Sequence, residues 1–206
     1  MIIRDIQSLV RRSSSGYVAY FYFDFRDVAK QNSRALLSSL VVQLSNQSEK
    51  FYGVLNGLYL EHQNGLEKPT NDSLLRCLMR MVTIAGLEPI YLVMDALDEC
   101  PNQGPNNVGV GSPREEVLKR VKELVELPNL RLCVTSRSES DICAVLEPLK
   151  PHQLSLHDET GQTQDIRDYV THIVRSNPCS NPQMKLWPDK IKDLVIEILS
   201  KKADGM

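Results

Sequence analysis

Three carboxylates follow directly after a short apolar run, and they are the first residues whose types and spacing suggest chemistry. The run covers residues 89–94, and Asp95, Asp98 and Glu99 come after it. In an open α/β sheet, ligands bind at the carboxyl ends of the strands. An Asp at that end can hold Mg²⁺, directly or through water, beside nucleotide phosphates. Asp98 or Glu99 could then orient an attacking water. The alternative is an ordinary acidic loop after a core strand.

A second apolar run ends in small polar residues and an arginine. Residues 129–134 lead into Thr135, Ser136 and Arg137. If the two runs are neighbouring parallel strands, Arg137 reaches the same edge of the sheet as Asp95. A guanidinium there can contact a terminal phosphate and sense its loss. Taken alone, Arg137 fits a solvated loop arginine better, but together the two strand ends favour a nucleotide site.

Strands that alternate with helices are needed to position these side chains, and the hydrophobic pattern predicts them. The expected strands cover residues 17–25, 89–94, 129–135 and 152–156. The expected helices cover residues 2–12, 33–45 with Ser33 as its N-cap, 48–60, 71–86, 114–126, 141–146, 165–175 and 189–203. The stretch 101–113 is rich in Pro, Gly and Asn and is expected to be a loop. The order predicts an α/β fold with a mainly parallel sheet flanked by helices.

Composition excludes several classes of protein. The 206 residues carry 24 Lys and Arg against 26 Asp and Glu, a formal charge of −2, without the basic footprint of a nucleic-acid binder. No apolar run approaches the ~20 residues of a membrane span. The five cysteines contain no CxxC pair, so reduced thiols and a cytoplasmic location are expected.

At this point the chain resembles a known family. It is similar to the NACHT group of signal-transducing (STAND) P-loop NTPases, in the version found in fungal receptor-like proteins and in the nephrocystin-like N-terminal domain. Residues 20–44 resemble the second strand and its helix, 92–100 the Walker B segment and 132–139 the sensor strand. Residues 152–156, 165–170 and 201–206 resemble the fifth strand and the start of a helical lid. The resemblance implies a partial nucleotide-binding domain at 1–156 and the beginning of a lid at 157–206.

The resemblance also implies roles for the strand-end residues. Asp95 would be the Walker B ligand of Mg²⁺, and one of Asp98 and Glu99 would activate water. Arg137, with Ser136 beside it, would contact the nucleotide. ATP is favoured over GTP, and nucleotide state would control self-association or the binding of protein partners.

One part of the family pattern is missing. The phosphate loop, GxxxxGK(S/T), occurs nowhere in the sequence, and the cluster Gly109-Val110-Gly111-Ser112 follows no strand and precedes no lysine. Without the backbone cradle and the lysine, tight nucleotide binding is not expected. The family's first strand, which lies inside the sheet, is absent too. We therefore expect an incomplete sheet, a truncated domain and marginal stability, because unpaired ladder groups cost about 1–3 kcal/mol each.

Three functions remain open from the sequence. The first is a nucleotide-binding segment of a switch ATPase, in which hydrolysis by this chain is uncertain. The second is a non-enzymatic remnant or adaptor that acts through protein–protein contacts. The third is a metal-dependent nuclease using Asp95, Asp98 and Glu99, for which the basic run at residues 119–122 gives little support. Cys100 is expected to be a packing residue, because no base lies near it in sequence.

Overall fold

The computed structural model describes residues 2–13, 15–103, 111–149, 152–153, 160–176, 184 and 187–202. The chain divides into two compact units, Met1–Pro151 and His152–Met206. The predicted boundary between domains lies near this division and stays a prediction. Within the described part of the chain, no helix has both the length and the apolar character needed to cross a bilayer.

The first unit is α/β. Its sheet has three parallel strands in the order β1-β2-β3, with β1 at Tyr17–Tyr22, β2 at Ile90–Asp95 and β3 at Leu130–Val134. This confirms the predicted fold class, a parallel sheet flanked by helices, as expected for an incomplete P-loop NTPase-like fold. In register, Ala19 pairs with Leu92 and Leu92 with Leu132.

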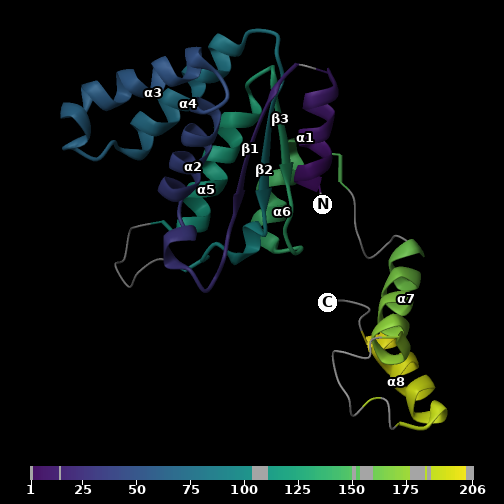
Figure 1. Ribbon diagram of the computed structural model, residues 1–206. Coiled ribbons are helices and arrows are strands. Elements are labelled where there is room, and N and C mark those ends of the chain that lie inside the picture. The colour runs from purple at the N-terminus through teal and green to yellow at the C-terminus, as the bar shows by residue number, and fades with distance from the viewer. Residues whose placement is uncertain are drawn as a thin grey trace. The chain divides into compact units, whose positions relative to one another are not determined.

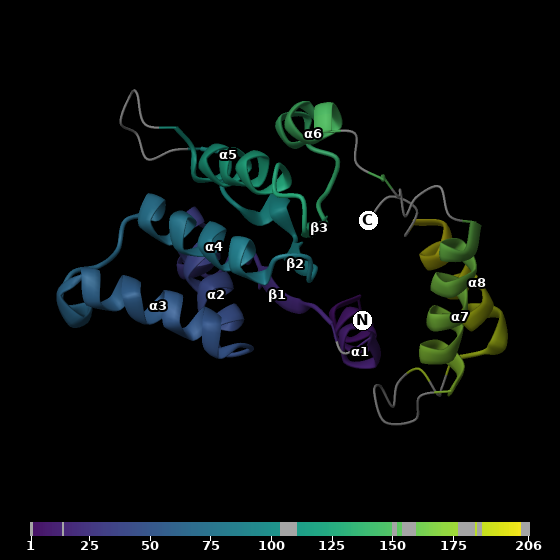
Figure 2. The ribbon, with the colours of Figure 1, turned by 90° about the horizontal axis from the view of Figure 1, so that it is seen from above.

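Helices fill the chain between the strands. The longer ones are α1 (Ile2–Ser13), α2 (Ser33–Ser45), α3 (Glu49–Glu61), α4 (Asn71–Ala85), α5 (Pro113–Val125) and α6 (Ser140–Leu146). The short 3-10 turns are η1 (Val28–Lys30), η2 (Gln63–Gly65), η3 (Leu97–Glu99) and η4 (Glu147–Leu149). Figure 1 shows α2 and α5 on one side of the strands and α1 on the other, and the view from above shows the same layers (Figure 2).

Apolar side chains form one continuous core under α2, α4 and α5. Among its fully buried members are Leu36, Leu40, Leu78, Ile90, Leu92, Met94, Val117 and Leu124. The even-numbered residues of β2 face this core, and Val93 on the opposite face is buried as well. Because the strand is covered on both faces, residues 89–94 form an unbroken apolar run. Between residues 2 and 146, each predicted helix and strand has an observed counterpart, because the hydrophobic patterns of these segments are clear.

In the first unit, the end of β1 and the N-cap of α2 differ from the expectation. β1 ends at Tyr22 rather than residue 25, because the last bond to its neighbour runs from the Phe23 N–H to the Asp95 carbonyl at 3.0 Å. The N-cap of α2 is Asn32 rather than Ser33, since the Asn32 carboxamide oxygen accepts the Ala35 N–H at 2.9 Å.

The second unit contains two long helices, α7 (Thr160–Ser176) and α8 (Asp189–Lys202). α7 begins five residues before the predicted helix 165–175, and α8 matches the predicted one closely. Arg175 of α7 and Asp193 of α8 form an ion pair. The predicted strand 152–156 lies mostly outside the described residues, as do Gly109 and Val110 of the predicted loop and the chain end from 203.

Candidate functional site

The predicted site residues follow the carboxyl ends of β2 and β3, which are neighbours in the sheet. We call residues 95–100 and 135–137 together the rim. β2 turns sharply at Ala96, whose φ of 56° and ψ of 49° lie in the left-handed region. This turn, followed by η3, moves the chain off the end of the strand and brings Asp98 within reach of Arg137.

Asp95 is held by the neighbouring strand. The Thr135 hydroxyl donates to Asp95 Oδ1 at 2.5 Å and accepts the Ala96 N–H at 2.9 Å. The Leu97 N–H donates to the Thr135 carbonyl at 2.9 Å. Thr135 therefore fixes both the carboxylate and the left-handed turn beside it, so that Asp95 stands half-buried in one orientation.

Asp98 and Arg137 meet across the same rim. The Arg137 N–H donates to Asp98 Oδ1 at 3.1 Å, and Arg137 Nε lies 3.5 Å from Asp98 Oδ2. The Asp98 side chain is only 12% exposed, whereas the Arg137 side chain is 85% exposed. Ser136 is also exposed, and its hydroxyl donates to the Arg137 carbonyl at 2.8 Å.

Glu99 connects the rim to the loop after β1. Its Oε2 accepts the Phe25 N–H at 3.1 Å. In that loop Arg26 lies over the Phe25 ring at 5.6 Å, and its Nε pairs with Asp24 Oδ1 at 3.1 Å. The hydrogen bond from Arg26 lowers the pKa of Asp24. The loop after β1 thus brings a carboxylate, Asp24, and a guanidinium, Arg26, to the same edge of the sheet.

Arg114, in the first turn of α5, holds the rim in place, although the sequence analysis did not single it out. Its buried guanidinium donates to the Asp98 carbonyl at 2.6 Å and to the Cys100 carbonyl at 2.8 Å. It also pairs with Asp141 of α6 at 3.2 Å. One side chain therefore fastens the turn after β2 to the starts of α5 and α6.

Two cysteines lie close to the rim. Cys100 is fully buried, and its thiol lies 3.3 Å from the Gln31 carbonyl. Burial raises the pKa of Cys100 to about 12, which is contrary to what a nucleophile needs. Burial also raises the pKa of Cys133 on β3, and the negative charge of Asp95 adds to that effect.

The rim fits one half of a magnesium–nucleotide site. Asp95, oriented by a hydroxyl at a strand end, suits a carboxylate that binds Mg²⁺ directly or through water. The phosphate half is incomplete, since the sequence lacks the phosphate loop and Arg26 and Arg137 each contact a carboxylate.

The nuclease hypothesis needs Asp95, Asp98 and Glu99 to converge on a metal. Asp95 and Asp98 instead accept hydrogen bonds from Thr135 and Arg137, and Glu99 accepts one from Phe25 in the loop after β1. Within the described ranges no group of three or more His, Cys, Asp or Glu side chains could hold a metal ion. This arrangement does not support the nuclease.

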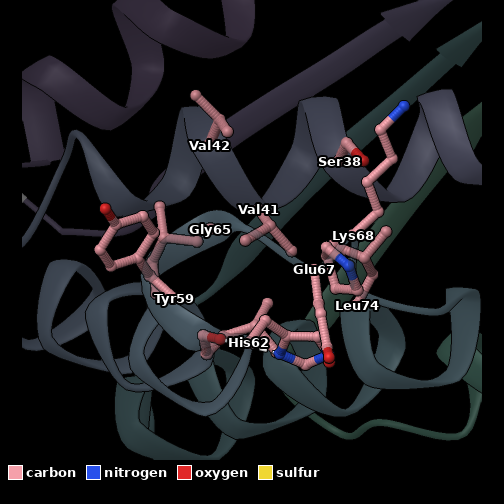
Figure 3. Close-up of a pocket in the computed structure, with 12 residues that line it drawn as sticks. Ser38, Val41, Val42, Tyr59, His62, Gly65, Glu67, Lys68 and Leu74 are labelled. Atoms are coloured by element: carbon pink, nitrogen blue, oxygen red, sulfur yellow. Dashed lines mark hydrogen bonds between the residues drawn. The ribbon is translucent and has the colours of Figure 1, made fainter.

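An apolar pocket of about 250 Å³ lies elsewhere, between α2, α3 and α4 (Figure 3). Val41 and Leu74 form part of its apolar wall, and His62 and Lys68 come from the connection between α3 and α4. A wider groove of about 900 Å³ runs along α5 towards Asp141. Among the described residues, none of the predicted site residues lines either of these two cavities.

Two residues that hold the rim in place escaped the sequence analysis. Thr135 was named at the end of its strand, but no role was predicted for it, because nothing in the sequence fixes the direction of a hydroxyl. Arg114 carried a detectable signal, since a cation in the first turn of a helix opposes the helix dipole and requires a nearby acceptor.

Comparison with known proteins adds one finding to this geometry. No curated protein and no solved structure matches the chain. The model of one family, described as Nephrocystin 3, N-terminal, matches residues 1–137, a stretch that includes all three described strands and the rim. The match covers well over half of the 206 residues. The chain therefore belongs to the nephrocystin 3 N-terminal family.

Proposed function

We propose that the chain carries the Walker B and sensor side of a NACHT-type nucleotide switch from a signal-transducing (STAND) P-loop NTPase. The observation that carries the proposal is the connection of two adjacent strand ends through Thr135–Asp95 and Arg137–Asp98 contacts. Parallel α/β sheets bind ligands at this edge. Membership of the nephrocystin 3 N-terminal family agrees with a signalling role.

Each rim residue has a part in this proposal. Asp95 would hold Mg²⁺, which when bound neutralises phosphate charge, and Thr135 keeps the carboxylate oriented. Asp98 or Glu99 would accept the proton of an attacking water in a complete ATPase. Arg137, with Ser136 beside it, would contact the terminal phosphate.

The pairing of Arg137 suggests how such a rim responds to nucleotide. Because its side chain is 85% exposed and contacts Asp98 only through Nε at 3.5 Å, a bound phosphate could draw the guanidinium away from that carboxylate. Exchange of Arg137 between Asp98 and phosphate would couple the nucleotide state to the loop that leads into α6. We propose this exchange as the conformational step of the switch, with ATP favoured over GTP.

As a chain of 206 residues, the protein is not expected to bind ATP tightly. It lacks the phosphate loop, and the carboxylates of the rim repel phosphate unless a cation is already held. Titration of this chain with a fluorescent ATP analogue should give no saturable binding at micromolar concentrations, with or without Mg²⁺. Micromolar affinity that disappears in Asp95→Asn would overturn this part of the proposal and leave the assignment of the site intact.

The metal role of Asp95 can be tested without nucleotide. Mn²⁺ is a paramagnetic probe of magnesium sites, and millimolar Mn²⁺ should broaden the amide NMR signals of Ala96 and Leu97. The broadening should disappear in Asp95→Asn and persist in Asp189→Asn, which removes an exposed carboxylate on α8. Equal broadening in Asp95→Asn would remove Asp95 from the metal role.

The second candidate function is an adaptor that acts through protein–protein contacts. It is favoured by the internal pairing of the rim charges and by the missing phosphate loop. A partner bound equally well with and without ATP, and by Asp95→Asn as well as by the unchanged chain, would support the adaptor over the switch. The cytoplasmic location expected from the cysteine pattern stays a prediction in both cases.

A further inference from the structure

The apolar pocket between α2, α3 and α4 has a buried floor and a partly exposed margin (Figure 3). The floor includes Val41, Leu58 and Leu74, which are all buried. Val42 and Tyr59, which also line the pocket, are 50% and 49% exposed. The buried residues give the pocket a fixed shape, and a ligand that covers the two half-exposed side chains removes apolar surface from water.

A glycine shapes the wall of the pocket at Tyr59. Gly65 has a φ of 84°, in the left-handed region that favours glycine. A Cβ on this residue would lie only 2.6 Å from Tyr59 Cε2, so the aromatic ring packs directly against the backbone of the connection between α3 and α4. This contact holds the Tyr59 ring at one end of the pocket (Figure 3).

Two polar groups on the opposite side of the pocket are unpaired. Ser38 of α2 and Lys68 of the connection both line the pocket, and Figure 3 shows them on the side away from Tyr59. Within the part of the chain that the structure describes, neither the Ser38 hydroxyl nor the Lys68 ammonium has a hydrogen-bond or ion-pair partner. An ammonium and a free hydroxyl together form a pair of donors suited to a carboxylate.

The side of the pocket at His62 and Glu67 has the opposite character. His62 Nδ1 lies 2.9 Å from the Leu58 carbonyl, and Nδ1 carries the proton because a carbonyl can only accept. Nε2 of the neutral ring is then an acceptor, and Glu67 adds a negative charge. Both groups disfavour an anion on this side. A carboxylate therefore fits at Ser38 and Lys68, which fixes the direction of a ligand.

The size of the pocket decides between a small molecule and a protein partner. An apolar cavity of about 150 Å³ holds benzene, so the volume of about 250 Å³ suits a short chain or a ring somewhat larger than that. A docked helix has a diameter of about 10–12 Å and buries a much longer stripe of side chains. The pocket thus fits a small ligand.

We propose that the pocket between α2, α3 and α4 binds a small amphipathic carboxylate with a short alkyl chain. The chain contacts Val41, Leu58 and Leu74, and the carboxylate accepts hydrogen bonds from Ser38 and Lys68. Because no residue of the rim lines this pocket, the inference goes beyond the nucleotide switch and does not depend on it.

Octanoate, octanol and octylammonium are matched probes, because they share the alkyl chain and differ in the charge of the head group. Titration at pH 7, followed by amide NMR, should give saturable shifts at the residues of the pocket. Octanoate should have a Kd at least roughly fivefold lower than those of octanol and octylammonium, since only its head group pairs with Lys68. Shifts that spread without saturation to the exposed Leu194 and Leu199 of α8 would overturn the proposal, because they would show binding to any apolar surface.

Substitution of Lys68 tests the selection of an anion. Lys68 is exposed, so Lys68→Met should leave the fold intact. It should weaken octanoate binding at least roughly fivefold and change octanol binding less than about twofold. Lys68→Arg, which keeps the charge, and Lys50→Met, which removes an exposed ammonium elsewhere on α3, should both bind octanoate as the unchanged chain does. Equal affinities for octanoate and octylammonium, or octanoate binding that is indifferent to Lys68→Met, would contradict the proposed site.

Discussion

Arg137 contacts Asp98 twice, once through its backbone N–H at 3.1 Å and once through its guanidinium at 3.5 Å. The Asp98 carboxylate is nearly buried, whereas the Arg137 guanidinium is almost fully in solvent. The two contacts therefore differ in strength. The backbone contact holds the loop after β3 against the turn after β2. The guanidinium contact is weak and replaceable, as a residue that exchanges partners requires.

This difference predicts unequal costs for the two residues. Arg137→Ala should lower the free energy of unfolding by less than about 1 kcal/mol, because it removes only a solvent-exposed ion pair. Asp98→Ala should cost more, about 1–3 kcal/mol, because it leaves the Arg137 N–H without its acceptor. Urea unfolding of the two variants measures both values. Equal losses would mean that the guanidinium, and not the backbone, holds the loop.

Arg114 should be the most sensitive polar residue near the rim. Its side chain is 8% exposed, and Arg114→Leu leaves the carbonyls of Asp98 and Cys100 and the Asp141 carboxylate without their donor. We expect a loss of about 2–4 kcal/mol in the free energy of unfolding, below the full value for a buried pair because Asp141 is partly exposed.

Arg114→Lys is the informative companion variant. It keeps the charge and loses the planar fork, so it should recover less than half of the lost stability. Arg137→Ala serves as the control for removing a guanidinium from the same region. Full recovery in Arg114→Lys would show that charge alone, without the hydrogen bonds to the turn, is what the site needs.

Thr135 should be needed for its hydroxyl rather than its shape. Thr135→Val preserves the volume but leaves both Asp95 Oδ1 and the Ala96 N–H without their partner, at a cost of about 1–3 kcal/mol. Thr135→Ser keeps the hydroxyl and should cost clearly less. Thermal or urea unfolding compares the pair, and a Val variant as stable as the Ser variant would contradict the role assigned to the hydroxyl.

Much of this arrangement could be predicted from the sequence, and the limits have physical causes. The runs that became β2 and β3 are short, apolar and bounded by turn residues, so their existence and adjacency followed from α/β rules. The aromatic run after Tyr17 continues to Phe25, but the strand stops earlier because β2 turns away at Ala96. Strand ends depend on where the partner ends, which a local pattern does not contain.

Polar contacts between residues far apart in the sequence were the second feature that could not be predicted. Gln43 lies on α2 and Gln47 follows the end of that helix at Ser45, yet only the structure shows that both side chains meet the edge of β1. Arg114 reaches carbonyls 14 and 16 residues before it. Side-chain direction decides such contacts, and the sequence constrains residue types and periods only.

The glutamine pair leads to a prediction about association. Replacing both residues in Gln43→Leu/Gln47→Leu leaves the outward groups of Val18 and Tyr20 unpaired and opens the β1 edge. The variant should lose about 2–4 kcal/mol of stability and show faster amide exchange at these two residues. It should also self-associate more than the unchanged chain in sedimentation experiments. Unchanged exchange at Val18 and Tyr20 would show that other groups protect this edge.

Buried thiols give the protein a predictable dependence on alkaline pH. Burial raises the pKa of Cys100 from 9.0 to about 12 and that of Cys77 to about 11. Because the folded state favours the neutral thiol, the stability from each group is fully present below pH 9. It is lost as the pH rises from 9 towards the folded pKa, at up to about 1.4 kcal/mol per pH unit for each thiol.

Cys100→Ala isolates this effect. The variant should be less stable than the unchanged chain at pH 7, because a buried thiol and its contact with the Gln31 carbonyl are lost. Between pH 9 and pH 11 its stability should fall less steeply, since Cys77 and Cys133 still contribute to the slope and Cys100 no longer does. Urea unfolding at half-unit pH steps measures both slopes, with Cys143→Ala, a partly exposed thiol, as the control. Parallel slopes in the Cys100→Ala variant and the unchanged chain would show that Cys100 ionises as easily in the folded state as in the unfolded one.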